Sequence, residues 1–224
     1  MGRPRRMMPG GYVYHVLNRG NERHILFHDD EDFWAFLRLL GQGPRRFGVR
    51  ICGYDLMRNH WHLLVWPRAD GAVSSYLHWV TTLHSLHYRR HHGGVGEGHV
   101  YQGRFRSFPV QTEGYYFKAL RYIEANALRA GVVSRAEDWR WSSLYERVNR
   151  RLMIDDGPLA LPSDWARIVN QVQQPQEVDA IRACLGKGRP YGADTWMVRT
   201  AAAQALDQTL RGPGRSGGGD ARRK

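Results

Sequence analysis

The sequence is poor in cysteine and contains no long apolar run. Its two cysteines, Cys52 and Cys184, are too few for a disulfide framework or a cysteine-based zinc site. No stretch approaches the ~18 apolar residues of a membrane span, and the basic start lacks the apolar segment of a secretory signal. The signatures His-Glu-x-x-His and Cys-x-x-Cys are also missing, which argues against zincins and zinc deaminases. We therefore expect a cytoplasmic protein with no membrane partner.

Acidic residues are outnumbered by basic ones. The 224 residues include 33 Lys+Arg and 21 Asp+Glu, which gives a formal net charge of +12. This excess favours a polyanionic partner, most often a nucleic acid, and a solvated basic surface without a specific ligand is the alternative. The hydrophobic content of 42% is high enough for a buried core, so the chain is expected to fold.

Hydrophobic periodicity predicts an α+β fold. Alternating patterns predict strands, and three-to-four-residue spacing predicts helices. The predicted strands are 11–18, 48–57, 60–66 and 100–110, and the predicted helices are 33–40, 74–90 and 113–130, with an interruption at 41–44. The order β-α-β-β-α-β, followed by a helix, is typical of a ferredoxin-like (split βαβ) antiparallel sheet with helices on one face. We expect a basic arm at 1–10, a main domain at 11–150, a small helical region at 151–210 and a flexible basic tail at 211–224.

Two histidines stand on either side of a tryptophan in the third predicted strand. The two-residue period of a strand places His60 and His62 on one sheet face and Trp61 on the other. Two neutral imidazoles on a rigid strand suit a divalent cation, and a hydrogen-bonded structural pair is the alternative. We interpret the other histidine clusters, at 84/87 and 91/92, as solvated or DNA-facing side chains of a helix.

The helix predicted after the fourth strand carries a polar stripe. Its members follow helical spacing: Lys118, Tyr122, Asn126 and Arg129. A phenol is a poor nucleophile near neutral pH, and nearby cations stabilise the phenolate. The Asn126 side-chain oxygen suits Mg²⁺ or Mn²⁺. Tyr115 and Tyr116 are weaker candidates, because the residues four positions on, Ala119 and Leu120, are not ligands.

Three further side-chain pairs have open interpretations. Arg104 and Arg106 lie on the predicted fourth strand and are candidate DNA contacts, or charges that protect an edge strand. Lys118 and Arg129 are candidates for binding DNA and for offsetting the charge that develops on a phosphate. Trp139 and Trp141 are expected to anchor the core, with base stacking as the alternative.

Several segments together resemble the REP-associated tyrosine transposases, which are HUH single-tyrosine transposases. His60-Trp61-His62 looks like the HUH motif, and residues 121–130 (RYIEANALRA) resemble the tyrosine helix of that family. Residues 98–107, 138–143, 164–165 and 189–192 add to the resemblance, which runs from about residue 11 to 211. One departure is Ala127, where the usual family text has a proline, so the helix is expected to continue past Asn126.

The resemblance implies a metal-dependent endonuclease and strand transferase that acts on single-stranded DNA. The substrate would be a hairpin-forming palindrome, cut through a 5′-phosphotyrosine intermediate with Tyr122 as the nucleophile. His60 and His62 would hold Mg²⁺ or Mn²⁺ with a third ligand from the tyrosine helix. We assign that position to Asn126, because Glu124 points about 200° away from Tyr122 around the helix. The competing interpretation is a ferredoxin-like nucleic-acid-binding module without catalysis. The sequence leaves open whether the protein is a monomer or a homodimer.

Overall fold

The computed structural model describes residues 8–93, 98–149 and 154–211. The predicted basic arm and basic tail therefore lie mostly outside the described residues. Among the described helices, none combines the length and hydropathy needed to cross a bilayer.

The centre of the molecule is a four-stranded sheet in the order β2-β3-β1-β4. The strands are β1 (Val13–Arg19), β2 (Val49–Met57), β3 (His60–Pro67) and β4 (Arg106–Val110). All three neighbouring pairs are antiparallel. This order is that of the split βαβ pattern, so the predicted fold class is confirmed.

The fourth strand is shorter than predicted. It begins at Arg106, whereas the sequence pattern placed its start at residue 100. Tyr101 makes only an isolated bridge to Gly20, and its hydroxyl is drawn into the core beside Trp61 and His84. Bends at residues 102–104 follow, so Arg104 lies in a loop and not on β4.

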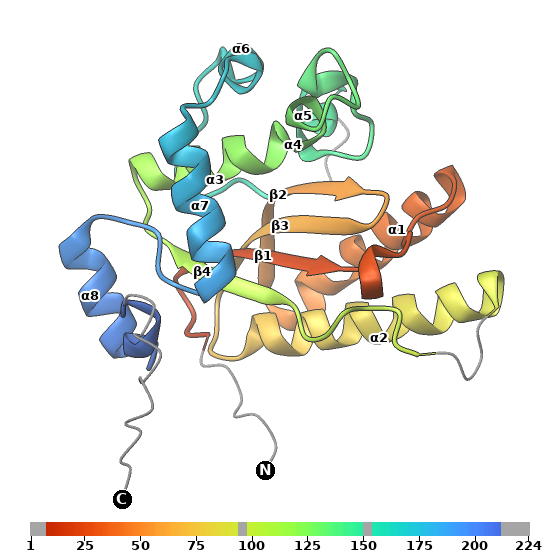
Figure 1. Ribbon diagram of the computed structural model, residues 1–224, viewed down its shortest axis with the longest axis horizontal. Coiled ribbons are helices and arrows are strands. Elements are labelled where there is room, and N and C mark those ends of the chain that lie inside the picture. The colour runs from red at the N-terminus through yellow and green to blue at the C-terminus, as the bar shows by residue number, and fades with distance from the viewer. Residues whose placement is uncertain (1–7, 94–97, 150–153, 212–224) are drawn as a thin grey trace, which may run out of the picture.

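Two long helices, α1 (Asp30–Phe47) and α2 (Ala72–His92), cover one face of the sheet (Figure 1). The predicted interruption at 41–44 is wrong, because α1 runs through Pro44. A proline has no N–H to donate to the carbonyl four residues earlier. The hydroxyl of Tyr76 donates to that carbonyl, on Leu40, at 2.8 Å, and so replaces the lost hydrogen bond. The Tyr76 ring can reach the Leu40 carbonyl because it packs directly against Gly43, which has no side chain.

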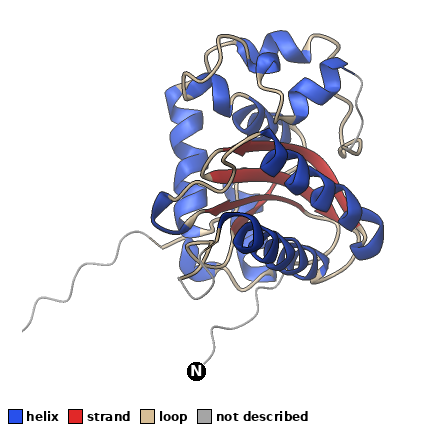
Figure 2. Ribbon diagram, turned by 90° about the vertical axis from the view of Figure 1, so that its right-hand side faces the viewer, coloured by secondary structure: helices blue, strands red, loops and turns tan. Residues whose placement is uncertain are grey.

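Shorter helices cover the opposite face (Figure 2). They are α3 (Gly114–Glu124), α4 (Asn126–Arg129), α5 (Ser143–Asn149), α6 (Trp165–Asn170) and α7 (Pro175–Lys187), while α8 (Asp194–Ala203) follows at the end. Three 3₁₀ turns complete the described elements: η1 (Asn21–Arg23), η2 (Ala136–Asp138) and η3 (Asp207–Thr209). The helices α6, α7 and α8 lie within 151–210, for which the sequence analysis expected a small helical region. Of these, α7 packs against β4 and α3.

The helix that carries the tyrosine is interrupted where the sequence predicted continuity. Ala125 has φ −86° and ψ 6°, which separates α3 from α4. Backbone hydrogen bonds still link Ala125 N to Arg121 O and Arg129 N to Ala125 O, so the stripe remains on one side. Gly131, at φ +69°, ends the second helix as predicted, since its left-handed conformation suits glycine.

Candidate active site

The two histidines lie on the sheet face that α3 covers. Trp61, on the opposite face, is buried against α1 and α2, as the alternation predicts. The rings of His60 and His62 are 5.3 Å apart between centroids and almost perpendicular, at 83°. Across the sheet they pair with Arg19 and Leu17 of β1.

Each histidine is held through its Nδ1 atom. Nδ1 of His62 lies 2.8 Å from Nε2 of His15, and Nδ1 of His60 lies 2.7 Å from Oδ1 of Asn59. Burial, reinforced by nearby positive charge, lowers the pKa of His60 to about 4 and that of His15 to about 3, and it lowers the pKa of His62 well below its usual range. All three rings are therefore neutral near pH 7. In His60 and His62, Nε2 is the ring nitrogen that takes no part in these Nδ1 contacts.

Tyr122 lies beside this pair. Its ring centroid is 5.9 Å from that of His62 and 5.9 Å from that of His15. The Arg129 guanidinium lies over the Tyr122 ring, 4.1 Å from the centroid. Tyr122 is 5% exposed and belongs to the hydrophobic cluster between α3 and the sheet, where two imidazoles and a guanidinium contact its ring. The polar stripe therefore meets the histidine pair.

The two rival tyrosines have other neighbours. Tyr115 makes an edge contact with Tyr191, 5.1 Å between centroids, and Tyr116 is buried in the core beside Cys52. Burial raises the pKa of Tyr116 far above its usual range. Neither geometry suits a nucleophile next to the histidines.

Asn126 joins the site through its side-chain amide. Nδ2 donates to Oδ2 of Asp55 at 2.9 Å and lies 3.5 Å from Nε2 of His60, while Oδ1 accepts from Arg129 at 2.9 Å. The amide thus turns its nitrogen toward His60, and a half-turn about its terminal bond would present the oxygen instead. Sequence reasoning missed Asp55, which is fully buried; burial raises its pKa to about 8.

The donor set fits a divalent cation held mainly by the two imidazoles. The imidazole nitrogens would come from His60 and His62, and Asn126 would add its side-chain oxygen only with the amide turned over, because its nitrogen lies nearest His60. In the described ranges, no three His, Cys, Asp or Glu side chains are grouped so that they could share a metal ion.

Two other charged residues of the tyrosine helices have different surroundings. Glu124 is fully buried, accepts hydrogen bonds from Ser143 and Trp165, and pairs with Arg147 at 2.9 Å, so its carboxylate has a structural role. Lys118 pairs with Glu177 of α7 at 2.8 Å. The structure therefore does not bring Lys118 to the histidine pair, whereas it does bring Arg129.

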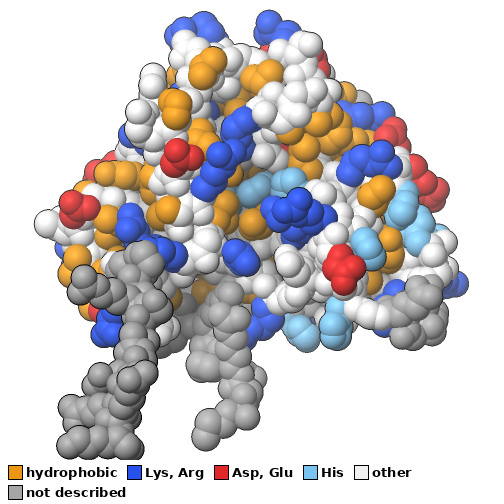
Figure 3. All heavy atoms as spheres, in the orientation of Figure 1, with side chains coloured by type: hydrophobic (Ala, Val, Ile, Leu, Met, Phe, Trp, Pro, Cys, Tyr) orange, Lys and Arg blue, Asp and Glu red, His pale blue; other side chains and the backbone are white. Residues whose placement is uncertain are grey.

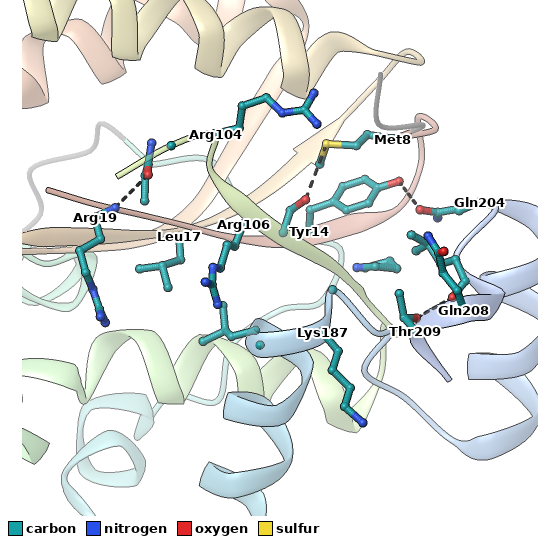
Figure 4. Close-up of a pocket in the computed structure, with 18 of the residues that line it drawn as sticks. Met8, Tyr14, Leu17, Arg19, Arg104, Arg106, Lys187, Gln204, Gln208 and Thr209 are labelled. Atoms are coloured by element: carbon teal, nitrogen blue, oxygen red, sulfur yellow. Dashed lines mark hydrogen bonds between the residues drawn. The ribbon is translucent and has the colours of Figure 1, made fainter. Parts of the chain in front are cut away.

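A cavity of about 930 Å³ runs around the β4 edge of the sheet (Figure 4). Its lining includes Arg19, Arg104, Arg106 and Lys187, and contains no Asp or Glu among the described residues. Arg19, Leu17 and Arg106 point to the side of the strands where Lys187 lies, and Arg104 lies on the other side. Because Arg19 and Leu17 pair with the two histidines, this basic groove begins next to the histidine pair.

A space-filling view shows the same relation at the surface. Histidine side chains are visible in the middle of one face, with Lys and Arg side chains on either side (Figure 3). Sequence reasoning found Arg104 and Arg106 but missed Arg19 and Lys187. No local signal marks these two, because only strand register and the packing of α7 bring them to the groove.

The remaining predicted aromatic pair is structural. Trp141 is 2% exposed and stacks on Phe33, 4.6 Å between centroids. Trp139 is partly buried and donates from Nε1 to the Leu56 carbonyl at 3.0 Å. Core anchoring, the favoured expectation, describes both.

Comparison with known proteins finds a matching family model and similar solved structures. A family model described as "Transposase IS200 like" matches residues 10–126, just over half of the chain, including His60, His62 and Tyr122. A solved structure of a REP-associated tyrosine transposase bound to a REP hairpin is similar in fold, with a TM-score of 0.54 and 21% identity. The alignment covers 73% of this chain and 96% of that one. No curated protein matches the chain.

Proposed function

Since the chain belongs to the IS200-like transposase family, we propose that it is a divalent-metal-dependent endonuclease and strand transferase for single-stranded DNA. Its proposed substrate is a hairpin-forming palindrome, like the REP hairpin bound by the structural neighbour. Cleavage proceeds through a 5′-phosphotyrosine on Tyr122.

The observation that carries this proposal is the convergence of three elements on one point. The ring of Tyr122 on α3 lies 5.9 Å from His62 on β3, and Arg129 on α4 contacts both the Tyr122 ring and Asn126. A nucleophile, two neutral imidazoles and a cation are thereby combined. A structural aromatic would need none of these neighbours.

The residues perform distinct parts of the reaction. The Tyr122 phenol oxygen attacks phosphorus, the bond from phosphorus to the 3′ oxygen breaks, and the proton lost by the phenol is balanced by one gained at the released 3′-hydroxyl. The Arg129 guanidinium lies over the Tyr122 ring and would offset negative charge that develops at the attacked phosphate. Its Nη1 is buried with no hydrogen-bond partner in the described structure, and is a donor for a phosphate oxygen. Mg²⁺ or Mn²⁺, when bound by His60, His62 and Asn126, supplies Lewis-acid polarisation of the phosphate.

The covalent intermediate explains how strand transfer needs no nucleotide cofactor. The phosphotyrosine retains the energy of the phosphodiester bond. A second 3′-hydroxyl then attacks the same phosphorus, a new phosphodiester forms and Tyr122 is released. Holding Tyr122 in a site that is 5% exposed also limits attack by water on the ester.

The basic groove is the proposed path of the single strand next to the cleaved phosphate. Positively charged grooves that follow the backbone are the general means of binding single-stranded nucleic acid. Arg19, Arg104, Arg106 and Lys187 supply the charge. Lys118, paired with Glu177, is left as a weaker contact outside this groove.

The sheet itself is not arranged as a stacking platform. A non-catalytic ferredoxin-like module would expose aromatic side chains on its central strands. Here Tyr14 and Trp61 are buried, and the half-buried Trp66 lies under Arg50, 4.6 Å from the ring centroid. The catalytic interpretation is therefore the better supported of the two.

The direct test uses a hairpin oligonucleotide with single-stranded flanks and Mn²⁺. The wild-type protein should form a covalent adduct that survives denaturing electrophoresis, and Tyr122→Phe should abolish it while binding is retained. Tyr115→Phe is the matched control and should still form the adduct. Adduct formation by Tyr122→Phe would contradict the assignment.

A further inference from the structure

His15 is a buried histidine that the proposed reaction does not use. It lies in the middle of β1, is fully buried, and packs edge-on against Phe108, 5.0 Å between ring centroids. Its other ring neighbours are His62 at 5.0 Å and Tyr122 at 5.9 Å. A histidine that only filled this space would be replaceable by an apolar ring of the same size.

The hydrogen bond between His15 and His62 has a direction that matters for metal binding. Nε2 of His15 and Nδ1 of His62 are 2.8 Å apart, so one ring donates the hydrogen and the other accepts it. If His62 accepts at Nδ1, its own hydrogen must sit on Nε2, and that nitrogen has no lone pair for a metal. If His62 donates from Nδ1, Nε2 is free.

In His60, Nδ1 donates its hydrogen to an oxygen, which leaves Nε2 free for a metal. Its Nδ1 lies 2.7 Å from Oδ1 of Asn59, and an oxygen can only accept, so Nδ1 carries the hydrogen. Metal-bound histidines almost always donate their other N–H to a fixed acceptor. For His62, the group at that position is Nε2 of His15.

The other nitrogen of His15 completes the argument. Nδ1 of His15 is buried and has no hydrogen-bond partner in the described structure. When His62 donates to Nε2, the single hydrogen of His15 must sit on this unpartnered Nδ1. When His15 donates instead, Nδ1 is an unpartnered acceptor, so this nitrogen lacks a partner in either arrangement.

We infer that His15 is a positioning residue, which accepts the Nδ1 hydrogen of His62 and so keeps Nε2 of His62 aimed at the divalent cation. The inference rests on the proposed metal-dependent function and extends it to a residue on another strand. It also explains why an imidazole occupies a position surrounded by Phe108, Leu64 and the Tyr122 ring.

Mn²⁺ affinity of the full chain, measured by electron paramagnetic resonance titration of free Mn²⁺, tests this role without measuring cleavage. His15→Phe keeps the ring but loses the acceptor, so it should bind Mn²⁺ about 10–100-fold more weakly, the usual cost of losing the acceptor behind a metal ligand. His15→Gln, whose Oε1 reaches the place of Nε2, should recover most of that loss. Phe108→Leu changes the packing around His15 without altering either of its ring nitrogens and should leave the affinity unchanged.

The outcomes separate this inference from the proposed function. Equal Mn²⁺ affinity in His15→Phe and the wild-type protein would overturn the role of His15, even if adducts form normally. Absence of adducts with intact Mn²⁺ binding would instead contradict the proposed function.

A second measurement needs no substitution. Two-bond ¹⁵N–¹H spectra of the ¹⁵N-histidine-labelled wild-type protein with Mg²⁺ should show His15 and His62 both carrying hydrogen on Nδ1. A hydrogen on Nε2 of His62 would overturn the inference.

Discussion

The two faces of the sheet bury different chemistry, although the same strands supply both. Under α1 and α2, β3 presents Trp61, Leu63 and Val65, and the Trp61 indole donates to Tyr101. Under α3, the same strand presents His62 next to Leu64. The first face is mainly an aromatic and aliphatic core, whereas on the second face the core is interrupted by His15, His62 and Asp55.

Three buried polar atoms of the second face lack hydrogen-bond partners near the histidines. Among the eight such atoms of the described residues, His15 Nδ1, Asp55 Oδ1 and Arg129 Nη1 lie around Tyr122 and Asn126, and the other five lie elsewhere. Such atoms cost stability in a folded chain and are uncommon in cores. The three beside Tyr122 and Asn126 lie where the proposed site would bind its ligand.

The largest effect on activity is expected on the site face. His62→Ala removes a proposed metal ligand, so adduct formation should fall by more than the ~100-fold that loss of a supporting group alone can cost. Adduct yield against Mn²⁺ concentration measures it. Unchanged adduct formation would show that His62 is a structural residue only.

Substitution of Trp61, the residue before His62, should reduce stability and leave the chemistry intact. Trp61→Ala removes a fully buried indole from the other face and should lower the free energy of unfolding by roughly 3–5 kcal/mol. Urea unfolding measures this, and adduct formation per folded molecule should stay close to wild type. A loss of chemistry in the folded variant would mean that the two faces are coupled.

Removing a positive charge from the basic groove should weaken DNA binding. Arg106→Ala and Lys187→Ala should each weaken binding of a single-stranded oligonucleotide and reduce the slope of log affinity against log salt by about 0.7. Arg199, exposed on α8 and outside the groove lining, is the matched control. Equal slopes for all three variants would contradict the proposed DNA path.

The smallest effect is expected far from the site, where His92 of α2 pairs with Asp32 of α1 at 2.9 Å. Burial alone would raise the pKa of Asp32, but hydrogen bonds from His92 and the His28 backbone N–H outweigh it and lower the pKa. Asp32 therefore stabilises the fold above its unfolded pKa of 3.8, and this contribution is lost as the pH falls through the lower folded-state pKa.

His92→Ala should consequently cost up to about 1 kcal/mol near neutral pH, where the partly exposed pair is intact, and less in acid. Thermal unfolding at several pH values checks this, with His91→Ala as the exposed control. A cost that grows toward low pH would contradict the assignment.

Local patterns in the sequence were enough for the strand order, for the face of His60 and His62, and for the stripe of Tyr122, Asn126 and Arg129. Each of these follows from a repeat of two or of three to four residues within one segment. The passage of α1 through Pro44 was not predictable in this way, because the hydroxyl that rescues it comes from Tyr76 on another helix.

The supporting residues of the site were missed for the same reason. His15 and Asp55 belong to no local motif, and only the pairing of β1, β2 and β3 brings them to His62 and Asn126. The break at Ala125 also has no sequence signal, since alanine favours helix.

The central claim is that the phenol oxygen of Tyr122 forms the covalent bond to DNA. Trypsin releases Tyr122–Arg129 as a peptide with one tyrosine, while Tyr115 and Tyr116 fall in a different peptide. Mass spectrometry of the trapped adduct should therefore find the 5′-phosphorylated nucleotide on the Tyr122–Arg129 peptide. A nucleotide on the peptide that holds Tyr115 and Tyr116 would contradict it.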